Sequence, residues 1–70
     1  MTYEEVKNIV LEDMNRLAKK AEAKPDITLT LYTHEYRAGK LTGMLKVYND
    51  LGFITNEEVS SIADEAFEII

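Results

Sequence analysis

The chain has 70 residues, no cysteine and a formal net charge of −5, and 46% of its residues are hydrophobic. This length allows a single domain over residues 1–70, and a chain of this size buries only about 60% of the surface that it exposes when unfolded. The lack of cysteine excludes disulfide bonds and cysteine-ligated zinc, so the fold must depend on packing or on a partner chain. The apolar fraction is typical of a globular protein and excludes a disordered one.

The N-terminal segment is predicted to be a helix over residues 3–23. Thr2 and Glu5 have the spacing of a capping box, in which each side chain bonds the backbone N–H of the other residue. Pro25 is expected to end the helix, because the residue before a proline disfavours helical angles. The apolar residues follow helical spacing: Val6, Ile9, Val10, Met14, Leu17, Ala18 and Ala21.

The middle of the chain allows two interpretations. Alternating apolar and polar residues over 27–31 predict a strand, but a single strand would have to pair with a second chain. Helical spacing also fits, with Ile27, Leu31, Ala38, Leu41, Leu45 and Tyr48 on one stripe. We therefore predict a second helix from about Leu29 to Asp50. The alternative is an α-β-α chain whose strand near residues 27–32 pairs across a dimer.

The C-terminal part of the chain, from Leu41 onward, has the pattern of a helical hairpin. Gly52 can adopt the left-handed conformation that closes a helix, with Phe53 folding back over Tyr48. Thr55 and Glu58 form a second capping box, and a helix of about 14 residues follows. The predicted fold class is therefore all-α, a small three-helix bundle with a C-terminal helical hairpin.

The predicted second helix carries a second apolar stripe, on the side opposite to the stripe that contains Leu41 and Leu45. The third helix spans about 21 Å against about 33 Å for the second, so it leaves part of that stripe without a neighbour. We expect an exposed aromatic patch there that binds a partner, formed by Leu29, Tyr32 and Tyr36. Gly39 and Gly43 share a face of the same helix, and we expect them to allow close packing inside the bundle.

Charge is distributed unevenly along the chain. Residues 1–46 carry eight basic and seven acidic residues, whereas residues 47–70 carry six acidic residues and no basic one. An acidic last helix repels phosphates, so we do not expect direct DNA binding through the helix–turn–helix outline. The acidic last helix suits a basic protein partner instead. The acidic residues predicted to bind that partner are Glu57, Asp64, Glu65 and Glu68.

Residues for catalysis or metal binding are scarce in this sequence. The only histidine is His34, and there is no cysteine nucleophile. We therefore expect neither an enzyme nor a metal ion or other cofactor.

The longest apolar runs have three residues, and the N-terminus is acidic. These features favour a cytoplasmic protein that has no membrane segment or signal peptide.

The turn after Leu45 has the pattern Gly-x-Ile-Thr-x-x-Glu, from Gly52 to Glu58. The segment from Leu45 to Val59 resembles the short helical hairpins of SHOCT-type domains, which implies a role in interaction or oligomerisation. In its small size, acidic charge and lack of cysteine, although in no sequence motif, the chain is similar to phage-encoded inhibitors such as anti-CRISPR proteins. That likeness implies a non-enzymatic module that docks on a basic nucleic-acid-binding surface of a host protein. The alternative function is a structural protein that forms homo-oligomers, including a homodimer.

Overall fold

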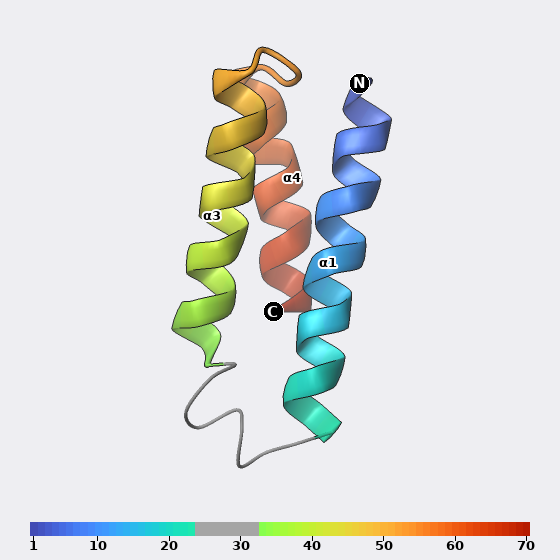
Figure 1. The fold of residues 1–70 in the computed structure, drawn as a ribbon, viewed down its shortest axis with the longest axis vertical. Helices are drawn as coiled ribbons and strands as arrows, with labels where there is room; N and C mark the ends of the chain where they lie inside the picture. Colours follow the sequence, from blue (N-terminus) through green and yellow to red (C-terminus); the bar gives the residue numbers. More distant parts are fainter. Residues whose placement is uncertain (24–32) are drawn as a thin grey trace.

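The computed structural model describes residues 1–23 and 33–70, and these residues form three helices and no strand (Figure 1). Helix α1 spans Tyr3–Ala23, α3 spans His34–Asp50 and α4 spans Asn56–Ile69. Each helix packs against the other two, so the predicted all-α three-helix bundle is confirmed. The alternative strand near residues 27–32 falls outside the described residues.

Both predicted capping boxes are present, and they fix where α1 and α4 begin. The Thr2 N–H donates to Glu5 Oε1 at 3.0 Å, and the Glu5 N–H donates to Thr2 Oγ1 at 3.2 Å. The bond from the Thr2 backbone N–H to the carboxylate is the main cause that lowers the pKa of Glu5, and the Thr2 side chain lowers this pKa further. In α4 the Thr55 N–H donates to Glu58 Oε1 at 2.8 Å, and the Glu58 N–H donates to Thr55 Oγ1 at 3.2 Å.

The predicted second helix is not continuous through Thr33, and its predicted start near Leu29 lies outside the described residues. Thr33 has an extended backbone with φ −64° and ψ 162°, and its hydroxyl accepts the Tyr36 N–H at 3.1 Å. Threonine is a favourable N-cap because its side chain satisfies an N–H that has no partner within the helix. Helix α3 therefore begins at His34 and has 17 residues, which makes α1, with 21 residues, the longest described helix.

The turn between α3 and α4 closes as the sequence predicts. Gly52 has a φ of +81°, the Gly52 N–H donates to Asn49 O, and the Phe53 N–H donates to Tyr48 O, both at 3.0 Å. This pair of bonds is the Schellman motif. The rings of Tyr48 and Phe53 lie with centroids 6.3 Å apart, so the expected hydrophobic contact is also present.

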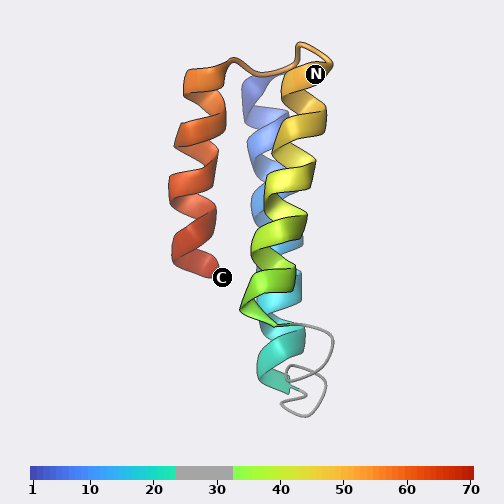
Figure 2. The ribbon, with the colours of Figure 1, turned by 90° about the vertical axis from the view of Figure 1, so that its left-hand side faces the viewer.

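The core lies along the common axis of the three helices. Helices α1 and α4 run in the same direction and α3 runs opposite to them (Figure 1). Helix α4 has 14 residues, and Figure 2 shows that it ends before the far end of α1. The buried core residues come from all three helices and the turn: Val6, Val10, Met14, Leu17, Leu41, Leu45, Ile54, Ile62 and Ala66.

Candidate protein-binding surfaces

The outer side of α4 carries three exposed carboxylates, Glu57, Asp64 and Glu68. They lie on the helix face turned away from the buried Ile62 and Ala66, because each residue advances about 100° around an α-helix. Within the described parts of the chain, none of the three makes an ion pair. The structure thus brings together three of the four acidic residues that the sequence predicted.

Glu65 lies apart from this acidic face. Its Oε2 is 3.1 Å from Nζ of Lys7 on α1. The Glu65 side chain is about half exposed, and the Lys7 side chain is mostly buried. The hydrogen bond and the negative charge of Glu65 raise the pKa of Lys7. Glu65 therefore joins α4 to α1, a role that its position in the sequence did not indicate.

The outer side of α3 exposes apolar residues. Tyr36, Val47 and Leu51 are 46%, 54% and 62% exposed. Tyr36 belongs to the predicted aromatic patch, whereas Leu29 and Tyr32 lie outside the described residues.

The expectation that α1 or α4 packs closely on Gly39 and Gly43 is wrong. A Cβ added at either glycine would meet no neighbouring atom within 4 Å, because both glycines are on the side of α3 opposite the buried Leu41 and Leu45.

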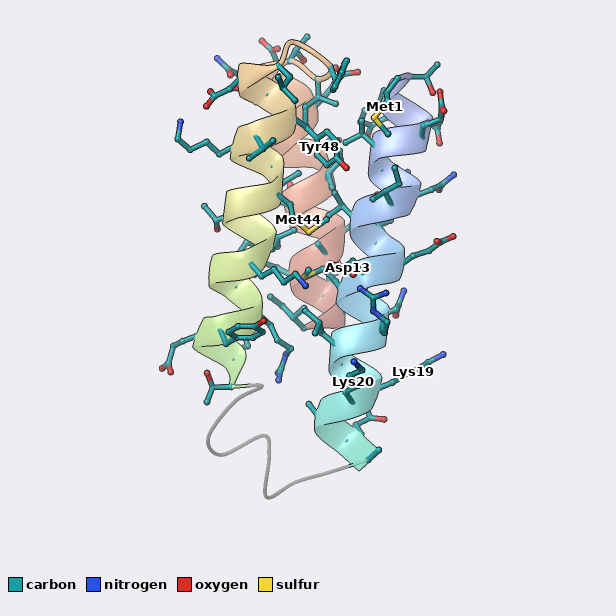
Figure 3. All side chains as sticks on the ribbon, in the orientation of Figure 1. Met1, Asp13, Lys19, Lys20, Met44 and Tyr48 are labelled. Atoms are coloured by element: carbon teal, nitrogen blue, oxygen red, sulfur yellow. The ribbon has the colours of Figure 1, made fainter. Side chains whose placement is uncertain are left out.

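Ion pairs cross two of the three grooves between the helices. The pair Lys7–Glu65 crosses the groove between α1 and α4. In the groove between α1 and α3, Nζ of Lys40 is 3.4 Å from Oδ2 of Asp13, which also binds Arg16. Figure 3 shows Asp13 and Met44 between these two helices.

The third groove, between α3 and α4, is open and largely apolar. Hydrogen bonds join α3 to α4 and its C-terminal residue at two places: Nδ2 of Asn49 donates to Oδ1 of Asn56 at 3.1 Å, and Nη2 of Arg37 donates to Ile70 O at 3.0 Å. Phe67, which is 48% exposed, lies at the edge of this groove. The sequence does not indicate this groove, because a helical pattern does not show how far a neighbouring helix reaches. The groove has a volume of about 390 Å³ and is lined by Leu41, Thr42, Leu45, Lys46, Asn49, Asp50, Asn56, Val59, Ala63 and Phe67.

Basic residues gather near the C-terminal end of α1. Arg16, Lys19 and Lys20 are exposed there and line a shallow, solvent-open hollow together with Glu12 and Asn15. Figure 3 shows Lys19 and Lys20 in the lower turns of α1, far from Met1. This part of the surface therefore has a charge opposite to that of α4.

The described residues contain no group of three or more His, Asp or Glu side chains that could hold a metal ion. The single histidine, His34, is the exposed first residue of α3. None of the described helices is both long enough and apolar enough to cross a membrane.

Comparison with known proteins gives no match: no family model, no curated protein and no solved structure shows significant similarity to this chain.

Proposed function

We propose that this chain is a non-enzymatic protein-binding module that docks through the acidic face of α4 on a basic surface of a partner protein. The acidic face consists of Glu57, Asp64 and Glu68. The observation that supports the proposal is that these three carboxylates are exposed on one side of a helix and make no ion pair within the described residues. Their full charge is therefore available to a partner.

A basic surface that normally holds nucleic acid is the partner class that fits this face. Carboxylates on a rigid helix attract the same lysine and arginine side chains that bind phosphates. The docked chain would exclude the nucleic acid from that surface and would act as an inhibitor, as expected for a phage-encoded protein of the anti-CRISPR type.

The test compares two charge-reversed variants that change the net charge equally. Asp64→Lys/Glu68→Lys changes the acidic face, and Glu12→Lys/Glu22→Lys changes exposed acidic residues of α1. The probe is a labelled peptide of lysine and serine, and fluorescence anisotropy measures its affinity at low and at physiological salt. We expect the α4 variant to lose about tenfold or more in affinity and the α1 variant to lose much less. Equal losses would mean that net charge alone attracts the peptide, and this result would contradict the proposal.

A second candidate function is a structural homo-oligomer that associates through the outer side of α3. The supporting observation is that Val47 and Leu51 are more than half exposed, and that a Cβ added at Gly43, about one turn before Val47, would meet no neighbouring atom within 4 Å. Light scattering at high micromolar concentration would then give a mass above that of one chain, and Val47→Lys would restore the monomer. A monomeric mass for the unchanged chain at that concentration would rule out this candidate.

A further inference from the structure

We infer that the groove between α3 and α4 binds a basic amphipathic helix of the partner protein, with Phe67 as the main apolar contact. The inference rests on the proposed function and adds to it the secondary structure of the partner segment and the position of its apolar face.

The shape of the groove fits one face of a helix. Leu41 and Leu45 are buried and form its floor, and the partly buried Val59 and Ala63 form the α4 wall. From Asn56 to Phe67 the groove follows α4 for about three helical turns, or about 16 Å. An amphipathic helix binds such a groove with apolar residues spaced three or four apart.

Two polar side chains on the α3 edge of the groove are bonded within their own helix, whereas Nδ2 of Asn49, at the turn end, donates to Oδ1 of Asn56 on α4 at 3.1 Å. On α3, Nζ of Lys46 is 2.9 Å from Oδ2 of Asp50, and the Thr42 hydroxyl donates to Ala38 O at 2.9 Å. A helix that docks over Thr42 and Lys46 would therefore leave the Asn49–Asn56 bond at the turn end intact, and it would form a bundle of four helices. The other two grooves are already crossed by ion pairs, which a docked helix would have to displace.

The charge of the two edges indicates which helix fits. Asp64 lies about 60° around α4 from Phe67, and Glu57 is two turns before Asp64 on the same side. The α3 edge has no net charge, because Lys46 and Asp50 neutralise each other. The docked helix is therefore expected to carry lysine or arginine on the side that faces α4. A second copy of this chain is disfavoured as the occupant, because it would bring another net charge of −5 to an acidic edge.

The test uses two peptides of equal length and charge. One is an amphipathic helix of leucine and lysine, and in the other each leucine is replaced by serine. Their affinities are measured by fluorescence anisotropy, and the binding site is mapped by NMR chemical shifts. We expect the leucine peptide to bind about tenfold or more tightly than the serine peptide and to shift the signals of Leu45, Ala63 and Phe67.

Two matched variants test the contact with Phe67. Phe67→Ala is expected to reduce the affinity for the leucine peptide about tenfold while leaving the affinity for the serine peptide unchanged. Val47→Ala changes an equally exposed residue on the outer side of α3, and we expect no effect on either peptide.

The outcomes separate this inference from the proposed function. Equal affinities for the two peptides, or shifts confined to α1 and the outer side of α3, would overturn the groove inference. If the serine peptide still bound through Asp64 and Glu68, acidic docking would stand without the groove. If neither peptide bound, both proposals would fail.

Discussion

Two glycines of this chain, Gly52 and Gly43, differ in whether the fold requires them. Gly52 has a φ of +81°, a conformation in which the side chain of an L-residue clashes with the backbone. Gly43 has ordinary helical geometry, and an added Cβ would meet no neighbouring atom within 4 Å. The fold of the single chain therefore requires glycine at position 52 and does not require it at position 43.

The same substitution should accordingly have opposite effects at the two positions. Gly52→Ala is expected to lower the free energy of unfolding by about 1–2 kcal/mol, since alanine is strained at positive φ. Gly43→Ala is expected to raise it by about 0.5–1 kcal/mol, because alanine is the better helix former. Urea unfolding followed by circular dichroism measures both values. A loss of stability in Gly43→Ala would show that the backbone around this glycine is more crowded than the structure indicates.

At the scale of single residues, the sequence predicted those features that depend on near neighbours. Thr2, Thr55 and Gly52 act on residues at most four positions away, so their roles follow from local spacing alone. The cap at Thr33 is also local, but the longer apolar stripe that runs through it favoured a continuous helix. A threonine hydroxyl placed to accept an N–H three residues later was the signal that could have located this boundary.

At the scale of one element, α4 presents three distinct sides. Ile62 and Ala66 are fully buried against the other helices, Asp64 and Glu68 face outward, and Phe67 lies between these two sides. The residues of α4 that stabilise the bundle are therefore different from those that we propose bind a partner.

Substitutions in α4 should separate these two properties. Ile62→Ala leaves a cavity in the core and is expected to lower the free energy of unfolding by about 2–4 kcal/mol. Phe67→Ala removes a side chain that is already 48% exposed, so we expect a loss of less than about 1 kcal/mol. Chemical denaturation checks both values. A large loss for Phe67→Ala would mean that its ring supports the core, and the peptide measurements would then need Phe67→Leu as well.

At the scale of the whole molecule, the contacts between helices could not be predicted from spacing. A helical pattern identifies the apolar side of each segment, and the buried residues in the described part of the chain are all apolar. It does not determine how far each helix is rotated and shifted against the next. For that reason the pairs Lys7–Glu65 and Lys40–Asp13, the open side of Gly43 and the groove at Phe67 appear only in the structure.

The parallel direction of α1 and α4 has a consequence for how the molecule meets a charged partner. Both helices start at the same end, where the carboxylates of Glu4, Glu5, Glu57 and Glu58 gather, and the basic residues Lys19 and Lys20 are near the opposite end. The long axis measures 38 Å, which is several times the screening length of about 8 Å at physiological salt. The two ends therefore act as independent electric poles, and the net charge of −5 describes neither of them. A basic partner would be attracted to the end where α1 and α4 begin and repelled by the basic end of α1, so the molecule is oriented during its approach.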